Sequence, residues 1–589
     1  MSMNYNLNQL QASDTGKKST GAAFRKLLPL LGRERKNLLV ALGANLVSSG
    51  LNLTGPILVG YTIDHYITKK QFHGVLVFSG ILVILYLGSL VTSYFQTKLM
   101  GGVGQRMLFH LRNEVFGKLQ RLPVAFFNQN KAGDLISRIN NDTDKLNQFF
   151  SQSLMQFIGS VFIMAGAGIF LLSINVRLGA ATLVPALLLL LFTRGLSTWV
   201  KSRNAASLRT TGGLSAEIQE SLNNFKAIVA FNRRDYFRKR FDVANRDNYQ
   251  AAVGAGLVNN IFLPVFSLSS NLGQLVVLSL GIYMISVGQF SVGLLISFLA
   301  YANSFYSPIR QLAALWTNFQ VAMAGWDRIS YILNLSSDLV PAENGGHPDP
   351  DGALTFSGVH FSYPDGKEVL HGINFKLEKG KTYALVGPTG GGKTTTASLI
   401  ARLYDPTTGY VLLDGKDIRS YPDAQRTTKV GFILQDPFLF TGTIRENILY
   451  ANEQYQDYSN EALETVLREA GLQALLQRFD QGLDTPVSAG GEGISLGQKQ
   501  LIAFMRAVLR KPELLILDEA TANIDTMTEQ LLQHILEQLP PGTTRVIIAH
   551  RLNTIENADE IFFVNAGNII QAGSFEHALD LLMRQKMES

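Results

Sequence analysis

A glycine-rich stretch in the C-terminal half of the chain has the residue types of a phosphate-binding loop. Residues 387–394 read Gly-Pro-Thr-Gly-Gly-Gly-Lys-Thr and fill every fixed position of the pattern GxxxxGK[ST]. Residues 381–386 read as a short buried strand and residues 394–403 as a helix, which is the context that the pattern requires and that a flexible linker lacks. Glycines allow successive backbone N–H groups to turn toward one point, and the helix N-terminus and Lys393 add positive charge. The stretch therefore predicts a cradle for a triphosphate, with the hydroxyl of Thr394 available to Mg²⁺.

Two acidic residues end a second apolar strand. Residues 514–517 are Leu-Leu-Ile-Leu, and Asp518 and Glu519 follow directly. We expect Asp518 to hold Mg²⁺ through water and Glu519 to orient or deprotonate the attacking water. The alternative is a strand that simply ends in solvated acids.

Two further polar residues follow apolar strands. His550 comes after Val546-Ile547-Ile548-Ala549, and Gln435 comes after Gly431-Phe432-Ile433-Leu434. His550 is suited to reach a terminal phosphate, and Gln435 to contact Mg²⁺ or water. Taken alone, the histidine is more typical of a structural residue and the glutamine of a surface amide.

The first half of the chain contains long uncharged stretches. The protein has 589 residues, too many for one hydrophobic core, so at least two domains are expected. About 20 apolar residues in a helix cross a bilayer, and stretches of this kind predict six membrane helices rather than helices buried in a soluble core. They are placed near residues 37–63, 72–98, 150–173, 177–199, 254–282 and 288–309.

Lys and Arg residues gather on one side of these helices. They are dense before residue 37 and in the segments 98–145 and 194–246, whereas the loops after the third and fifth helices carry at most Arg177. The basic side faces the cytoplasm, which places both termini there and the protein in the inner (cytoplasmic) membrane. The net charge of +6 then reflects membrane topology, and no nucleic-acid partner is expected.

Cysteine content and the residues before the first membrane helix give two further expectations. The absence of cysteine excludes disulfides, thiol catalysis and cysteine-bound metals. No cleaved signal peptide is evident, and residues 21–36 mix Leu and Phe with Arg and Lys, as in an amphipathic helix in the inner interface. A plain solvated leader is the alternative.

Two long cytoplasmic connections, residues 99–150 and 195–252, are charged and nearly free of proline. Each reads as two helical extensions that meet at a turn. The first turn falls near residues 126–138 and the second near residues 213–224. Without further information these are exposed helical hairpins and nothing more.

A segment rich in Pro, Gly and Asp separates the membrane region from alternating strands and helices. We predict a leader with an interfacial helix (1–36), a six-helix transmembrane domain with long intracellular extensions (37–335), a linker (336–352) and an α/β domain (353–589).

Together these residues resemble the ATP-binding cassette (ABC) family. The resemblance rests on Tyr363, the phosphate loop, Gln435, the sequence Ile494-Ser495-Leu496-Gly497-Gln498, the acidic pair, Asp525 and His550, in that order. Six membrane helices fused to one cassette are similar to an exporter half-transporter, including the sequence Gly133-Asp134-Leu135-Ile136-Ser137-Arg138 at the first turn. The resemblance implies a type I exporter fold with an α/β P-loop nucleotide-binding domain.

The resemblance also implies roles for individual residues. Tyr363 would stack on the adenine of ATP, although one aromatic residue before Pro364 is also typical of a plain turn. Gln435 would couple the nucleotide site to the membrane helices, and Asp525 would lie in the loop that crosses the dimer interface. Ser495, Gly497 and Gln498 belong to the signature segment, in which Ser495 and Gly497 bind the γ-phosphate of ATP held by another subunit. In this interpretation the ATP contacts are Tyr363, Gly387, Pro388, Thr389, Gly390, Gly391, Gly392, Lys393, Thr394, Thr395, Ser495, Gly497, Gln498 and Asp525; the Mg²⁺ ligands are Thr394, Gln435 and Asp518; and the catalytic residues are Glu519, His550 and Gln435.

A single cassette has one phosphate loop and one signature, so the resemblance requires a second half-transporter subunit. Leu496 stands where many members have Gly, and residues 521–525 read Thr-Ala-Asn-Ile-Asp where homodimeric relatives often have Ser-Ala-Leu-Asp. Both departures resemble the catalytically complete subunit of bacterial heterodimeric multidrug exporters, whose partner has a degenerate ATP site. A homodimer with neutral changes at these positions is the alternative, because the signature contacts need Ser495 and Gly497 more than the residue between them.

The function that this resemblance implies is ATP-driven export of apolar or amphipathic small molecules by alternating access. Few ionisable groups lie in the predicted helices, which favours a cargo of this kind, whereas Asn259, Asn260, Asn271 and Gln274 are equally typical of contacts between helices. A lipid flippase, a siderophore-type importer and an ATP-gated channel or regulator on the same fold are alternatives. A soluble cassette ATPase acting on nucleic acid or ribosomes is disfavoured by the uncharged stretches.

Overall fold

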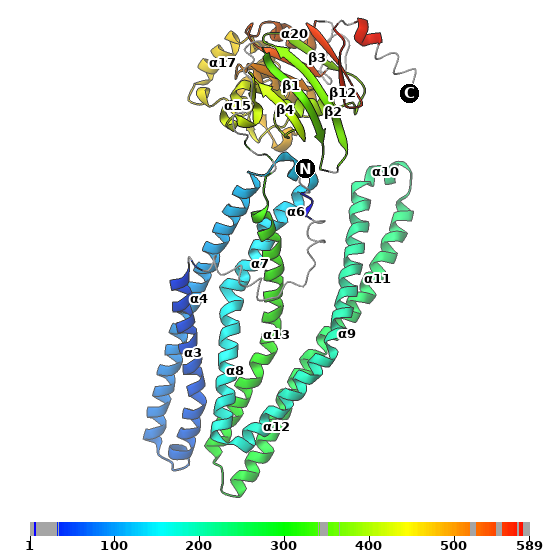
Figure 1. Cartoon of the computed structure of the whole chain (residues 1–589). Helices are drawn as coiled ribbons and strands as arrows, with labels where there is room; N and C mark the ends of the chain where they lie inside the picture. Colours follow the sequence, from blue (N-terminus) through cyan, green and yellow to red (C-terminus); the bar gives the residue numbers. More distant parts are fainter. Residues whose placement is uncertain are drawn as a thin grey trace. The chain divides into compact units, whose positions relative to one another are not determined.

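The computed structural model of the chain forms two compact units, which are described separately (Figure 1). The helical unit comprises residues 17–118 and 136–334. The sheet unit comprises residues 1–16, 119–135 and 335–589. The structure describes residues 5–7, 32, 34–337, 339, 341, 352–364, 366–518, 526–548, 557–573 and 576–580.

Six helical runs are long and apolar enough to cross a membrane, as predicted from the uncharged stretches. Each run extends well beyond a bilayer-spanning length, which agrees with the expected helical extensions. The runs are α3 (Arg35–Thr62) with the π-turn η1 (Ile63–Ile67); α4 (Phe72–Leu119); α6 (Ala132–Ser137) through η2 (Arg138–Asp142), α7 (Thr143–Gln148), η3 (Phe149–Ser153) and α8 (Leu154–Ile174); α9 (Val176–Asn223); α11 (Arg234–Asn260) with α12 (Phe262–Ser286); and α13 (Val292–Asn334).

The fifth and sixth runs differ in detail from the prediction. The expected continuous helix over 254–282 is interrupted between α11 and α12 at Ile261. Pro264 explains the break, because it lacks a backbone N–H and its ring clashes with the carbonyl four residues earlier, that of Asn260. The sixth helix begins at Val292 rather than at residue 288, after the left-handed Gly288.

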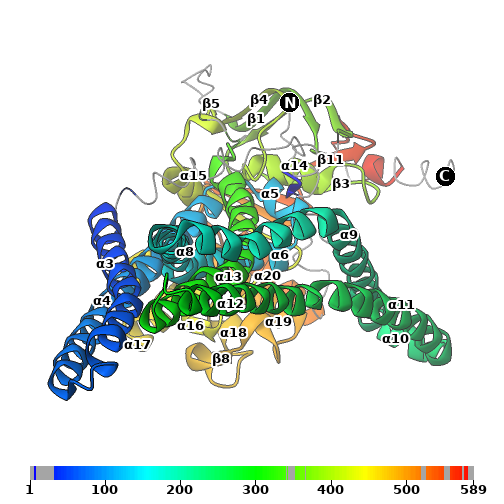
Figure 2. The same ribbon diagram turned by 90° about the horizontal axis from the view of Figure 1, so that it is seen from below.

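Both predicted turns are accompanied by a short helix. The first, α5 (Val124–Gln129), begins two residues before the predicted range 126–138 and overlaps its start. The second, α10 (Phe225–Ala230), lies just beyond the range 213–224, because α9 stays helical to Asn223. Figure 2 shows α9 and α11 side by side with α10 at their end. We call residues 119–135 the first tip and residues 224–233 the second tip.

Two tyrosines of α13 hydrogen-bond to neighbouring helices close to prolines. The hydroxyl of Tyr301 donates to the carbonyl of Leu53 (2.6 Å), and that of Tyr306 donates to the carbonyl of Thr182 (2.6 Å). Each carbonyl lies three residues before a proline, Pro56 in α3 or Pro185 in α9, where the ring perturbs the helical ladder. Because a bilayer supplies no water, side-chain donors of this kind satisfy the perturbed backbone.

The two ends of α13 are held by carboxylates. Asp64 accepts a hydrogen bond from the backbone N–H of Gly293 (2.8 Å) at the start of the helix. Near the other end, Arg328 donates to both carboxylate oxygens of Asp142, 2.6 Å from Nε and 2.5 Å from Nη2. The Asp142 side chain is only 4% exposed, and bidentate pairing of this kind is what makes burial of its charge tolerable.

The sheet unit is built around a largely parallel sheet with the strand order β12-β11-β3-β10-β9-β6. Its strands are β3 (Thr382–Val386), β6 (Val430–Ile433), β9 (Leu514–Asp518), β10 (Thr544–Ile548), β11 (Glu560–Asn565) and the antiparallel edge strand β12 (Asn568–Gln571). A second, antiparallel sheet has the order β2-β1-β4-β5, from β1 (Gly352–Ser362), β2 (Glu368–Glu378), β4 (Thr408–Leu413) and β5 (Lys416–Asp417). A two-stranded ribbon joins β7 (Gly442–Thr443) to β8 (Pro486–Val487).

Helices complete the unit. They are α14 (Lys393–Ile400), α15 (Asp423–Lys429), α16 (Ile444–Leu449), α17 (Asn460–Glu469), α18 (Gln473–Leu476), α19 (Leu496–Val508) and α20 (Thr526–Glu537). Strands β3, β9 and β10 are buried over nearly their whole length, as expected for parallel strands covered on both faces. The carboxyl ends of β3, β6, β9 and β10 therefore meet at one edge of the sheet, where ligands bind in open α/β folds.

The fold class is confirmed as a six-helix membrane region followed by an α/β domain. The last membrane helix ends at Asn334 and β1 begins at Gly352. Most of the predicted interfacial helix (21–36) lies outside the described residues, and the four predicted domain ranges stay predictions.

Candidate nucleotide-binding site

The predicted phosphate loop lies between β3 and α14, in the strand-to-helix context that the motif needs. Gly387, Gly390 and Gly392 have φ values of 144°, 81° and 116°, in the region that favours glycine. A Cβ added at Gly387 would lie 2.0 Å from the carbonyl oxygen of Val564 in β11. The loop backbone thus packs directly against the neighbouring strand, and only glycine fits at this position.

Lys393 bridges the loop from the first turn of α14. Its Nζ donates to the carbonyl oxygens of Gly387 and Pro388, both at 2.9 Å, and the residue is only 5% exposed. The positive charge is therefore held at the mouth of the loop, beside the helix N-terminus. This placement suits a ligand with several negative oxygens.

The loop meets the acid of the second motif. Thr394 is exposed, and its Oγ1 lies 3.5 Å from Oδ1 of Asp518, the buried last residue of β9. A hydroxyl and a carboxylate that face the same point are hard oxygen donors of the type that Mg²⁺ prefers. Among the described residues no cluster of three His, Asp or Glu side chains could hold a metal alone, so this pair would need further oxygens from a ligand or water.

The other loop residues complete the turn. Thr389 and Gly390 are exposed at its tip. Gly391 donates its N–H to the carbonyl of Pro388 (3.1 Å) and accepts from the N–H of Gly567 (3.0 Å), which ties the loop to the turn between β11 and β12.

Tyr363, which directly follows β1, joins the antiparallel sheet to the phosphate loop. Its hydroxyl lies 3.0 Å from Oγ1 of Thr395 in α14. Its ring packs edge-on against Phe361 and Tyr404, with centroid distances of 4.9 and 5.4 Å. The predicted adenine-stacking residue is therefore half-buried beside the loop, supported by two aromatic rings.

Replacing Tyr363 by alanine should weaken ATP binding by roughly 5- to 150-fold, since stacking a base on an aromatic ring is worth about 1–3 kcal/mol. Binding of inorganic tripolyphosphate, which has no base, should change much less. Isothermal titration with both ligands measures the two effects. Tyr363→Phe keeps the ring and removes the hydroxyl that contacts Thr395, so an equal loss of ATP affinity in that variant would contradict a stacking role.

Tyr404 was not identified from the sequence. Besides packing on Tyr363, its hydroxyl accepts a hydrogen bond from Nδ2 of Asn128 in the first tip (2.8 Å). A tyrosine before Asp405-Pro406 has no distinctive sequence pattern, so only the fold reveals that it links the tip to the predicted base site.

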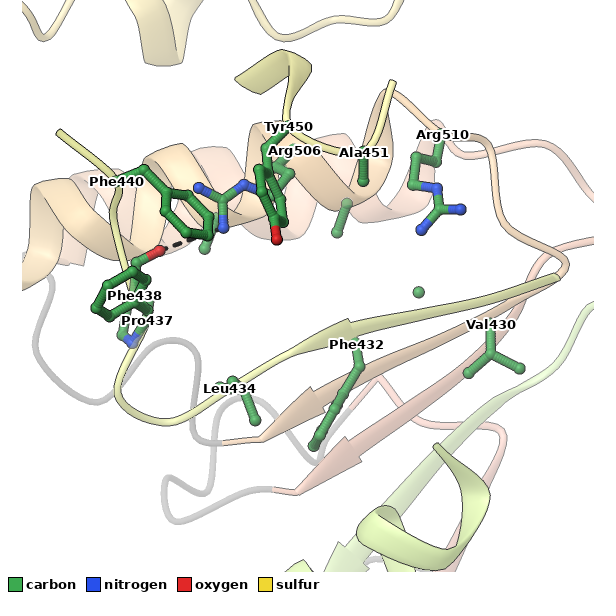
Figure 3. A pocket seen from close by; sticks show the side chains of 13 residues that line it. Val430, Phe432, Leu434, Pro437, Phe438, Phe440, Tyr450, Ala451, Arg506 and Arg510 are labelled. Carbon is green, nitrogen blue, oxygen red and sulfur yellow. Dashed lines mark hydrogen bonds between the residues drawn. The ribbon is translucent and has the colours of Figure 1, made fainter. Parts of the chain in front are cut away.

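Gln435 lies two residues beyond β6, exposed at the carboxyl edge of the parallel sheet. The segment that follows borders a groove of about 250 Å³ between β6, α19 and the end of α16 (Figure 3). Arg506 crosses this groove, donating to the carbonyl of Phe438 (3.2 Å) while its guanidinium lies over the ring of Tyr450. Burial lowers the pKa of Arg506, which stays charged at neutral pH because arginine starts from a very high value.

The signature segment forms the N-terminus of α19. Ser495 is the N-cap, and its Oγ accepts from the backbone N–H of Gln498 (3.2 Å) while Gln498 Oε1 accepts from the N–H of Ser495 (3.1 Å). Gly497 lies in the first turn between them. None of the hydrogen bonds given for the described residues joins this segment to the phosphate loop.

Three predicted residues lie outside the described residues. Glu519 follows Asp518, Asp525 precedes α20, and His550 comes two residues after the end of β10. Their predicted roles stay predictions.

Comparisons with known proteins identify the family. The family model described as ABC transporter transmembrane region matches residues 38–309, and the model described as ABC transporter matches residues 370–522. An uncharacterised ABC transporter ATP-binding protein of Bacillus subtilis is 34% identical over 97% of this chain and 93% of its own length. The chain belongs to the ABC transporter family.

Other ABC transporters with named activities are similarly related. A fatty acid ABC transporter ATP-binding/permease protein of Mycobacterium tuberculosis is 35% identical, over 85% of this chain and 78% of its own length. A multidrug resistance ABC transporter ATP-binding and permease protein of Lactococcus lactis is 31% identical, over 84% and 83%.

Family membership confirms several predictions at a coarse level. This ABC transporter is a multi-pass membrane protein that binds ATP and couples its hydrolysis to transport. It has one membrane region and one cassette, the composition of a half-transporter, and such ABC half-transporters generally dimerise.

Proposed function

We propose that this ABC transporter exports apolar or amphipathic small molecules, of the multidrug type, across the cytoplasmic membrane by alternating access. The cassette and both termini lie on the cytoplasmic side. The domains have the predicted ranges 1–36, 37–335, 336–352 and 353–589. The chain is one of the two different subunits of a heterodimeric transporter. The proposal of a dimer is supported by the presence of one phosphate loop and one signature segment in the chain, because a chain with one of each needs a second chain to close an ATP site.

The ATP site combines the residues described above. Residues 387–395 cradle the phosphates, Tyr363 stacks on adenine, and Ser495, Gly497 and Gln498 meet the γ-phosphate of ATP held by the other subunit, with Asp525 at the interface. Thr394, Gln435 and Asp518 hold Mg²⁺, which neutralises charge on the phosphates when bound. Glu519 and His550 act on the attacking water and the terminal phosphate.

Closure of the cassettes over ATP drives the membrane helices through the two tips. Closure is favoured because the bridging phosphates contact both subunits only in the closed state, and this differential affinity is what shifts the equilibrium. The first tip contacts the cassette of its own chain through Asn128 and Tyr404.

The second tip presents apolar side chains to solvent. Phe225 is 56% exposed and Phe231 is 78% exposed. The groove of Figure 3 has an apolar lining around Phe432, Leu434 and Phe438, so it is a suitable receptor for such a tip from the second subunit.

A lipid-like cargo is the second candidate, supported by the mycobacterial relative that is named as a fatty acid transporter. Both candidates share an apolar or amphipathic substrate, which agrees with the scarcity of ionisable side chains in the membrane helices.

Reconstitution of the full chain in lipid vesicles, alone and with each candidate partner, tests the proposal. ATP-dependent movement of several dye classes and of a fluorescent fatty acid is measured, with the Glu519→Gln variant as the matched control for hydrolysis. Movement with one specific partner only is expected. A stable dimer of the chain alone with full transport-coupled ATPase activity would contradict the heterodimer, and ATP hydrolysis without movement of any tested class would contradict export of this cargo.

A further inference from the structure

Residues at the extreme N-terminus are buried against the first tip. Tyr5 is 0% exposed and Leu7 is 1% exposed, although chain ends of this kind are usually frayed. They belong to the same compact unit as the first tip and the cassette. A terminus packed this tightly has specific contacts, which the side chains of the first tip supply.

Two amide side chains of the first tip bind the backbone of this terminus. Gln129 Oε1 accepts from the N–H of Tyr5 (2.7 Å). Asn130 accepts from the N–H of Leu7 at Oδ1 (3.1 Å) and donates from Nδ2 to the carbonyl of Tyr5 (2.9 Å). The two bonds made by Asn130 hold the backbone of this segment at both Tyr5 and Leu7.

The side chain of Tyr5 connects the tip to the chain beyond the last membrane helix. Its ring meets the ring of Phe126 edge-on, with centroids 6.2 Å apart. Its hydroxyl donates to the carbonyl of Ser336 (3.2 Å), two residues after α13 ends. One residue of the N-terminus therefore bridges the first tip and the start of the linker.

The same tip contacts the cassette through the residue next to Gln129. Asn128 donates to the hydroxyl of Tyr404, whose ring packs on Tyr363 at the predicted base site. Helix α5 has only six residues, too few to be stable without tertiary contacts. The N-terminal residues cover Phe126 on this helix and bind its end at Gln129, so they restrict the position from which Asn128 reaches Tyr404.

We infer that residues Tyr5–Leu7 form an N-terminal strap that positions the first tip, and that Tyr5 is a positioning residue for the coupling of ATP hydrolysis to transport. The inference rests on the proposed role of the tips in transmitting cassette closure. The hydrogen bonds described for the strap go to Gln129 and Asn130 of the first tip and to Ser336, not to the phosphate loop. Loss of the strap should therefore leave ATP affinity in place and lower the coupling between the two activities.

The test uses the full chain with its transport partner and three variants. Tyr5→Ala removes the ring and the hydroxyl, whereas Tyr5→Phe keeps the ring and removes the hydroxyl that binds Ser336. Tyr458→Ala, at a 41% exposed tyrosine of the cassette, is the matched control. Hydrogen exchange of residues 124–130 measures strap docking. The KM for ATP and the number of substrate molecules moved per ATP hydrolysed measure coupling.

We expect Tyr5→Ala to speed hydrogen exchange at residues 124–130 on the order of tenfold. The free energy of local opening falls in this variant, because opening no longer exposes a buried ring or breaks the hydrogen bond to Ser336. In the same variant the number of substrate molecules moved per ATP should fall severalfold, while the KM for ATP stays unchanged. Tyr5→Phe should give exchange and coupling values between those of wild type and Tyr5→Ala, and Tyr458→Ala should give wild-type values. A synthetic peptide of residues 1–12, added to a chain lacking residues 1–7, should restore slow exchange and coupling.

Unchanged exchange in Tyr5→Ala would show that the strap is not docked and would overturn the inference. Faster exchange with unchanged coupling would also overturn it, because the strap would then be structural only. If wild type itself moved no substrate, the proposed export would fail, and the exchange measurements would still decide separately whether the strap docks.

Discussion

Glu519→Gln is expected to lower the rate of ATP hydrolysis by about two to four orders of magnitude, the usual contribution of a positioned general base. ATP binding should persist, because the substitution removes a charge near the water and leaves the phosphate loop and Asp518 unchanged. The strand that carries this site supports the prediction: β9 is buried throughout, and Asp518 at its end faces Thr394 of the loop. Steady-state ATPase assays and equilibrium ATP binding measure the two effects.

The matched control lies at the other end of the same strand. Glu513 precedes β9 and forms an exposed ion pair with Lys429 (2.8 Å). Glu513→Gln should change hydrolysis by no more than about twofold, since exposed ion pairs contribute little. Undiminished turnover in Glu519→Gln would remove the catalytic assignment of that residue.

Lys393→Ala is expected to weaken ATP binding by roughly 10- to 150-fold, because a hydrogen bond to a charged group is worth about 1.5–3 kcal/mol. Hydrolysis should fall further, by two or more orders of magnitude, if the ammonium also stabilises charge in the transition state. In the structure the Lys393 ammonium binds the carbonyls of Gly387 and Pro388 at the mouth of the loop. Phosphate oxygens would compete with these neutral carbonyls as charged acceptors, which are the stronger partners.

Lys381→Ala is the control for this variant. Lys381 lies just before β3, at the opposite end of the strand from the loop, and forms a surface ion pair with Glu378 (2.5 Å). We expect ATP binding and hydrolysis close to wild type. Thermal unfolding of both variants without nucleotide should separate loss of the ligand contact from loss of the fold, and equal ATP affinity in Lys393→Ala and wild type would contradict the assignment.

Much of the fold could be predicted because its signals are local. Membrane helices follow from long uncharged stretches, and the phosphate loop follows from fixed glycines whose positive φ values the structure confirms at Gly387, Gly390 and Gly392. Asp518 could be placed beside Thr394 because parallel buried strands present their carboxyl ends at one edge.

Features that depend on contacts between distant segments could not be predicted. The helix break at Ile261 was not predicted, because the long apolar stretch favours a continuous helix more strongly than the single Pro264 favours a break. Tyr404 and the N-terminal strap have no pattern of their own, since their partners lie far away in the chain. The identity of the second subunit could not be predicted either, because it depends on contacts with another chain.

The tyrosine bonds from α13 resist sliding of this helix past two of its neighbours. Tyr301 and Tyr306 bind buried carbonyls of α3 and α9, and an interface without water offers no replacement partner for a broken bond. Other buried bonds tie α3 to α8 through Asn45 and α9 to α12 through Ser269. Movement along any of these interfaces should therefore occur as a discrete step between two packings rather than as gradual bending.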